Sequence, residues 1–183
     1  MAAAFGLGAA LGVFGLLASK LTAEDGAASV SPHAVWTEVQ WPFRMDEWGK
    51  GKAFRCKAAD CGAEVNLYIR AKIGFCNCTT GVADDEELER LSDFLLVGNQ
   101  LSAMGQGQPI TVAHMKGRSR PYSIVTADRS DKSALSVAFN DRCDAIVATV
   151  ITGHAKPTVI EPTVIAFLNG ATVLRWAEVT LGL

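Results

Sequence analysis

The residues in this sequence best suited to chemistry are its five cysteines. Cys56, Cys61, Cys76 and Cys78 follow the spacing C-x4-C-x14-C-x-C, and Cys143 comes much later in the chain. Cysteine sulfurs bind soft metal ions such as Zn²⁺ and Cu⁺, and pairs of cysteines form disulfides. One metal ion shared by the first four cysteines would require all four sulfurs to meet at a single point.

The segment between the two cysteine pairs argues against such a shared ion. From Glu64 to Ile73 polar and apolar residues alternate without interruption, which predicts a strand with one buried and one wet face. Ten extended residues span about 33 Å, whereas tetrahedral zinc needs every sulfur within about 2.3 Å. A strand over these residues would hold Cys61 and Cys76 at opposite ends, so a zinc ribbon is disfavoured.

Disulfides suit a domain outside the cytoplasm, which is the location expected below, better than a shared metal ion does. We expect a bridge between Cys56 and Cys61 across the short loop of a hairpin. Cys143 is the expected partner for the Cys76 and Cys78 pair, which leaves one cysteine free. The alternative is that Cys76 and Cys78 use their C-x-C spacing to bind Zn or Cu, or to exchange disulfides.

Other catalytic signatures are missing from the sequence. It contains no G-x-S-x-G, H-E-x-x-H or C-x-x-C motif and no Walker or Rossmann glycine pattern. Its three histidines, His33, His114 and His154, are isolated from one another. The sequence therefore favours a protein that is not an enzyme and that needs no cofactor.

The elements that must position these residues follow from hydrophobic periodicity. Leucines at helical spacing predict a helix over 84–97, with Asp84 as its N-cap. A second helix is expected to start at Pro162 and to end at Leu168, before an asparagine and a glycine. We expect both helices to pack on one face of the sheet.

The remaining patterns predict strands joined by short turns, and hence a mostly antiparallel sheet in an α+β domain over 35–183. The basic residues 116–120 are expected to form a solvated turn, and 100–108 a loop. Three hairpins are predicted: 53–56 with 64–73, 110–115 with 121–126, and 135–139 with 145–151.

An apolar segment precedes this domain. Residues 1–20 contain no charge before Lys20, and nineteen helical residues reach about 28 Å, close to the thickness of a bilayer core. We expect a transmembrane anchor or a secretory signal, followed by a tether over 21–34. Gly8 and Gly12 form a small-xxx-small pair that would let another transmembrane helix approach closely.

Composition narrows the function further. Seventeen basic residues against nineteen acidic ones give a net charge of −2, which offers no general attraction to nucleic acid. Trp36, Trp41 and Trp48 concentrate aromatic surface after the tether. The sequence thus favours a membrane-tethered accessory or assembly subunit that makes protein contacts in a membrane complex. Its domain is expected outside the cytoplasm, in the periplasm, or secreted if the apolar segment is removed.

Overall fold

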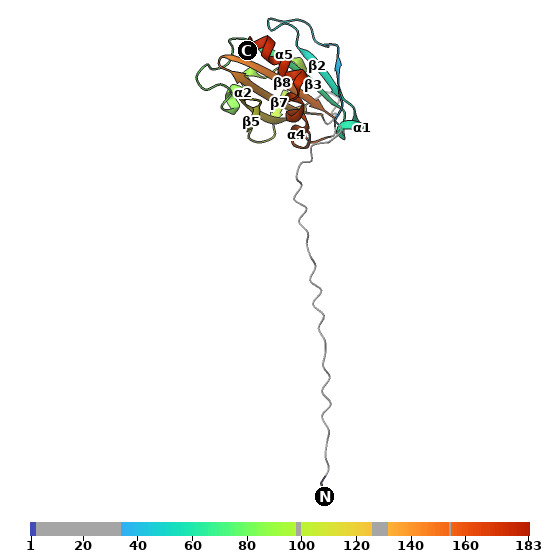
Figure 1. Ribbon diagram of the computed structural model, residues 1–183. Helices are drawn as coiled ribbons and strands as arrows, with labels where there is room; N and C mark the ends of the chain where they lie inside the picture. Colours follow the sequence, from blue (N-terminus) through green and yellow to red (C-terminus); the bar gives the residue numbers. More distant parts are fainter. Residues whose placement is uncertain (3–33, 98–99, 126–131, 154) are drawn as a thin grey trace.

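The computed structural model describes residues 1–2, 34–97, 100–125, 132–153 and 155–183 (Figure 1). Residues 3–33, which hold the rest of the apolar segment with Gly8 and Gly12, lie outside the described residues, and the expectations for this segment remain predictions. The elements in chain order are β1 (Trp36–Val39), β2 (Lys52–Cys56), α1 (Ala58–Cys61), β3 (Val65–Lys72), α2 (Asp85–Leu91), α3 (Phe94–Val97), β4 (Gln100–Ala103), β5 (Gln108–Val112), β6 (Met115–Val125), β7 (Lys132–Asp141), β8 (Asp144–Thr152), α4 (Pro157–Leu168) and α5 (Ala171–Leu181).

The described strands form one sheet of eight strands, and every neighbouring pair is antiparallel. The strand order is β1-β2-β3-β8-β7-β6-β4, with β5 pairing on the same edge of β6 as β4. This confirms the α+β class and the mostly antiparallel sheet. The hairpins β2–β3 and β7–β8 are close to the predicted ones. Strict alternation of polar and apolar residues marks β3, whereas β8 is a nearly continuous apolar run that is buried on both faces.

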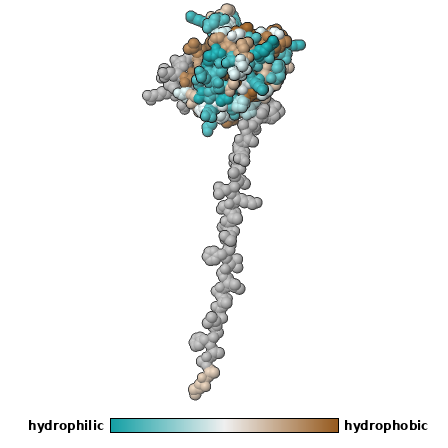
Figure 2. All heavy atoms as spheres, turned by 90° about the vertical axis from the view of Figure 1, so that its left-hand side faces the viewer, coloured by the Kyte–Doolittle hydropathy of each residue, from teal (hydrophilic) through white to brown (hydrophobic). Residues whose placement is uncertain are grey.

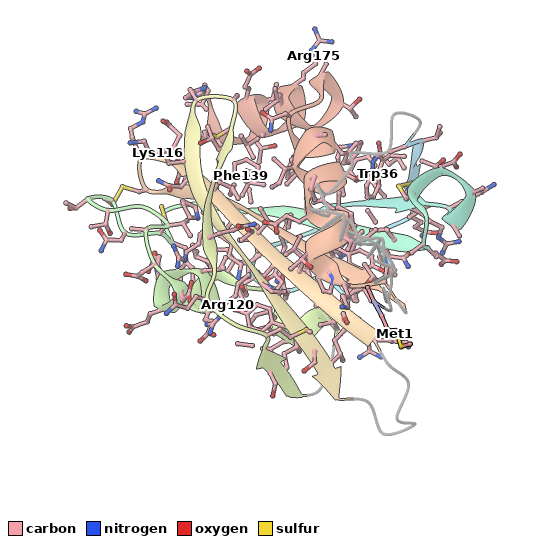
Figure 3. The ribbon with its side chains drawn as sticks, turned by 90° about the horizontal axis from the view of Figure 1, so that it is seen from below. Met1, Trp36, Lys116, Arg120, Phe139 and Arg175 are labelled. Atoms are coloured by element: carbon pink, nitrogen blue, oxygen red, sulfur yellow. A yellow bond between two sulfur atoms is a disulfide. The ribbon has the colours of Figure 1, made fainter. Side chains whose placement is uncertain are left out.

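The sheet buries both of its faces. Leu135, Val137 and Phe139 of β7 join one core with buried residues of α4 and α5, and Phe139 lies in the interior (Figure 3). Ala138, between two of these residues, points the opposite way and packs with Leu88 of α2. We call the two sides the α4/α5 face and the α2 face. The expectation that both main helices cover one face is therefore wrong.

The predicted helix over 84–97 is divided in two. Asp84 is the N-cap, and its side chain accepts a hydrogen bond from the Glu87 N–H at 2.8 Å, as expected for a capping residue. The helix α2 ends at Leu91, and α3 begins at Phe94. This interruption places Asp93 between the two helices, where it is buried.

The C-terminal helices are longer than the sequence indicates. The helix α4 begins at Pro157, so Pro162 lies inside it and not in its first turn. Proline in the interior removes one helical hydrogen bond, but Ile160 and Val164 of this helix are buried in the core and stabilise it there. The segment after Asn169, for which no helix was predicted, forms α5.

The basic segment 116–120 is part of β6 and is not the predicted turn. The reversal occurs earlier, at Ala113 and His114, which join β5 to β6. Gly117 is required inside the strand, because a Cβ atom there would lie 2.1 Å from the Ala138 carbonyl oxygen and 2.7 Å from the Phe139 Cβ. Residues 100–103, expected in a loop, form the short strand β4.

No single helix among the described residues is long and apolar enough to cross a bilayer. The α4–α5 pair reaches that length and composition only when taken together, with a bend of 66° between the two helices.

Candidate functional site

The cysteines form two disulfides and leave one thiol. Cys56 is bonded to Cys61 across α1, as the sequence predicts, and this closes the β2–β3 connection. Cys78 is bonded to Cys143, which ties the segment after β3 to the β7–β8 turn. Disulfides persist in oxidising compartments outside the cytoplasm.

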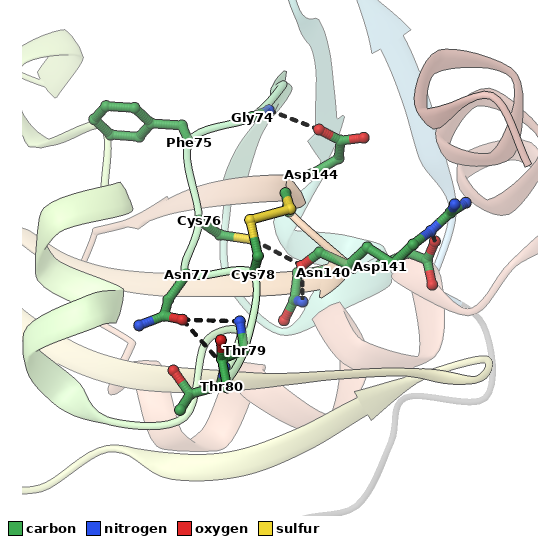
Figure 4. Close-up of a disulfide and its surroundings, with 12 residues drawn as sticks. Gly74, Phe75, Cys76, Asn77, Cys78, Thr79, Thr80, Asn140, Asp141 and Asp144 are labelled. Atoms are coloured by element: carbon green, nitrogen blue, oxygen red, sulfur yellow. Dashed lines mark hydrogen bonds and ion pairs between the residues drawn. A yellow bond between two sulfur atoms is a disulfide. The ribbon is translucent and has the colours of Figure 1, made fainter.

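Cys76 is the free cysteine of the chain and lies close to the second disulfide (Figure 4). Its N–H donates to the Cys143 carbonyl at 3.1 Å, and its sulfur donates to the Arg142 carbonyl at 3.2 Å. Burial, together with the negative charges of Glu87 and Asp144, raises the pKa of this thiol. Cys76 is therefore held as a neutral thiol.

In this structure Cys78 is in a disulfide and offers no thiolate to the metal site predicted at Cys76 and Cys78, which stays a prediction. Among the described residues, no group of three or more His, Cys, Asp or Glu side chains is arranged to hold a metal ion. Zn or Cu binding by the C-x-C pair would require the Cys78–Cys143 bond to be reduced first.

The three tryptophans that the sequence groups together do not share one surface. Trp36 stacks on Phe167 of α4, with ring centres 4.6 Å apart, and so belongs to the α4/α5 face. Trp41 contacts Phe43 and Tyr68 edge-on, at 5.3 and 6.2 Å. Trp48 packs against Phe75 at 4.7 Å. Of the three, Trp48 alone lines the cleft described next.

This cleft has a volume of about 570 Å³ and lies on the α2 face. The connection between β1 and β2 forms one wall, and the α2–α3 junction forms another. The fourteen lining residues are Phe43, Arg44, Met45, Asp46, Glu47, Trp48, Arg70, Lys72, Phe75, Arg90, Ser92, Asp93, Leu95 and Leu96. The side of the domain that carries α2 in Figure 1 is seen face-on in Figure 2, where hydrophilic and hydrophobic side chains are mixed.

The floor of the cleft is a buried network of charges. Arg70 donates from Nε and Nη2 to the two oxygens of Asp93, each at 2.6 Å, and from Nη1 to both oxygens of Asp46 at 2.7 Å. The Lys72 ammonium lies 2.9 Å from an Asp93 oxygen. Burial lowers the pKa of Arg70, but the two aspartates raise it by more. The guanidinium is thus fixed in its charged form.

Aromatic rings cover the second cation of this floor. The Lys72 ammonium lies 5.3 Å from the centre of the Trp48 ring and 5.7 Å from that of Phe75. Arg90 packs on Phe75 at 4.6 Å and donates to the Phe75 carbonyl at 2.5 Å. Cation–π contacts of this kind hold the aromatic wall in place.

No protein-family model and no curated protein matches the chain. Its site therefore has to be interpreted from the chemistry of its own side chains. A cleft of several hundred Å³ with apolar walls and a few convergent charged groups is the usual form of a binding site.

A second set of ion pairs fastens α2 to β6 beside the cleft. Asp85 accepts from the Arg118 Nε and, at 3.1 Å, from the Gly107 N–H. Arg120 donates to Glu89 at 2.6 Å. Burial raises the pKa of Asp85, but hydrogen bonds from Arg118 and Gly107 lower it below its usual value. These contacts hold α2 against β6, and Asp93 comes shortly after the end of α2 at Leu91.

The sequence did not reveal Asp46, Arg70, Lys72 or Asp93 as a site. Arg70 and Lys72 occupy the polar positions of an alternating strand, which predicts a wet face, yet both are buried. Alternation looks the same whether the polar side meets water or other protein. Asp93 was hidden because the leucine spacing suggests one continuous helix through it.

Proposed function

We propose that this protein is a non-catalytic accessory or assembly subunit, and that its domain recognises a partner protein through the cleft on the α2 face. The observation that carries the proposal is the contrast between the rim and the floor of this cleft. Leu95 and Met45 at the rim expose 98% and 67% of their surface, although the floor is a fully paired network of charges. Exposed apolar residues around a concave site are typical of contact surfaces.

The cellular setting proposed for this subunit is outside the cytoplasm, tethered to a membrane by residues 1–20. The two disulfides support an oxidising compartment. A membrane anchor is proposed because the residues before Lys20 carry no charge. Gly8 and Gly12 are proposed to contact a neighbouring transmembrane helix. Detection of the N-terminal peptide in the mature protein would support an anchor, whereas its absence would indicate a cleaved signal.

Site-specific photo-crosslinking in the source cells tests the cleft. A photoreactive residue is placed at Leu95, at Met45 or, as the control, at Val179, which is 77% exposed on α5 at the other face. We expect the two cleft positions to give the same discrete crosslinked partner and Val179 to give none. Equal products from all three positions, or none from the cleft, would refute the proposal.

The alternative function is thiol or metal handling by Cys76 and Cys78. The observation that favours it is the free thiol two residues away from a disulfide. A thiol count with metal analysis of the purified protein separates the two functions. Accessory function predicts one thiol that reacts only after denaturation, whereas stoichiometric Zn or Cu that disappears on Cys76→Ser would establish the alternative.

A further inference from the structure

The two carboxylates that hold Arg70 are placed very differently. The Asp93 side chain is 4% exposed, lies between α2 and α3, and also pairs with Lys72. The Asp46 side chain is 32% exposed and belongs to the β1–β2 connection, outside any helix or strand. Asp93 is therefore a permanent partner of Arg70, and Asp46 is the more easily exchanged one.

The segment that carries Asp46 has few other attachments. Within the described part of the chain, the Asp46–Arg70 pair is the one hydrogen-bonded contact that joins residues 43–49 to another element. The hydrogen bonds from the Trp48 and Gly49 N–H groups to Asp46 are local. Ring contacts of Phe43 and Trp48 supply the rest. Displacing Asp46 would thus break one polar contact and leave the sheet intact.

Arg70 restricts what can take the place of Asp46. Arg70 would keep Asp93, but displacing Asp46 leaves its Nη1 donor without a hydrogen-bond partner, which is unfavourable at a buried position. A group that takes the place of Asp46 must therefore bring an acceptor to Nη1. Among the described ion pairs, removing Asp46 leaves the buried cations Arg70 and Lys72 with one carboxylate, Asp93. The vacated position is therefore selective for an anion, and a carboxylate reproduces the two oxygens that Asp46 presents.

The walls of the cleft add a second requirement. Trp48, Phe75 and Leu95 line the same cleft as Asp46 and give it apolar surface, and Met45 precedes Asp46 in sequence. We propose that Asp46 is an internal substitute for a carboxylate of the partner protein, an acidic side chain next to an apolar residue. Binding exchanges the two carboxylates on Arg70. This inference rests on the proposed function, because it names the feature that the cleft recognises.

Two peptides test the exchange: acetyl-Leu-Asp-Leu-amide and its counterpart with Asn in place of Asp. Each is titrated by NMR into the full-length protein, and the tryptophan indole signals are followed. The protein is used unchanged, as Asp46→Asn, which removes the internal competitor, and as Glu47→Gln. The last variant is the matched control, because Glu47 lines the same cleft, loses the same charge and has no contact with Arg70 in the described structure.

We expect the Asp peptide to bind Asp46→Asn about fivefold more tightly than the unchanged protein, because a partly exposed ion pair no longer competes. Glu47→Gln should leave its affinity unchanged, and the Asn peptide should bind none of the three proteins detectably. Equal affinities of both variants, equal binding of both peptides, or no binding of the Asp peptide to Asp46→Asn would each overturn the exchange. If the exchange fails while crosslinks from Leu95 persist, the partner binds through apolar contacts and the proposed function stands.

Discussion

The two faces of the sheet are both buried, but different forces hold them. On the α4/α5 face, twenty buried residues form one apolar core among the described residues, whereas the α2 face has clusters of seven and three. The α2 face compensates with ion pairs, of Arg70 and Lys72 to Asp93 and of Arg118 to Asp85.

This difference suits the two faces to different tasks. Apolar contacts are non-directional and stabilise the fold only while their side chains stay packed away from water. The α4/α5 face is therefore suited to holding the fold together. Ion pairs are directional and can be exchanged for a similar group on another molecule. The α2 face is therefore where a partner could replace an internal contact without dismantling the core.

The largest effect is expected from Phe139→Ala on the α4/α5 face. Phe139 is completely buried, so its removal leaves a cavity and should lower the free energy of unfolding by about 3–5 kcal/mol. The matched variant Phe75→Ala on the α2 face, where the ring is half-buried, should cost less than half as much. Urea unfolding followed by circular dichroism measures both, and equal losses would contradict the division between the faces.

An intermediate effect is expected from Asp93→Asn. The amide would remove the carboxylate that pairs with buried Lys72 and would leave Arg70 with Asp46 alone, so the free energy of unfolding should fall by about 3 kcal/mol. Glu161→Gln on the other face is the control, because Glu161 is equally buried but bonds to the Ser119 hydroxyl. An amide can keep that hydrogen bond, so its loss should be about 1 kcal/mol or less. Similar losses for both variants in urea would show that charge pairing does not distinguish the faces.

The smallest effect is the dependence of stability on pH. Arg70 lowers the pKa of Asp46, Arg90 lowers that of Glu87, and Arg118 with Gly107 outweighs burial to lower that of Asp85. A carboxyl whose pKa is lowered by folding stabilises the folded state at pH values above its ordinary pKa, which is 3.8 for Asp and 4.5 for Glu. This stabilisation is lost as the pH falls through the lower pKa of the folded state. The melting temperature should therefore drop below about pH 4.5. Asp85→Asn should flatten this drop, and a curve that this variant leaves unchanged would exclude Asp85 as one of its sources.

The sequence alone determined the features that depend on neighbouring residues. Strict alternation located β3, the Asp84 cap located the start of α2, and close spacing was enough to predict the Cys56–Cys61 bridge. The sequence also indicated Cys143 as the distant partner of the C-x-C pair, although it left open which of the two cysteines it would join. These interactions are local, or depend on a period that one strand or helix displays by itself.

Only the tertiary structure decided where the polar sides of these elements meet. Arg70 and Asp93 are 23 residues apart, and neither carries a signal for the other, because a charged position on a strand has the same pattern whether water or a carboxylate faces it. In the sequence Gly117 indicated a turn, but in the structure it lies within β6. Glycine is needed at this position because the neighbouring strand leaves no room for a side chain. The cleft exists because long-range strand pairing brings β3, α2 and the β1–β2 connection together, and no local pattern records that pairing.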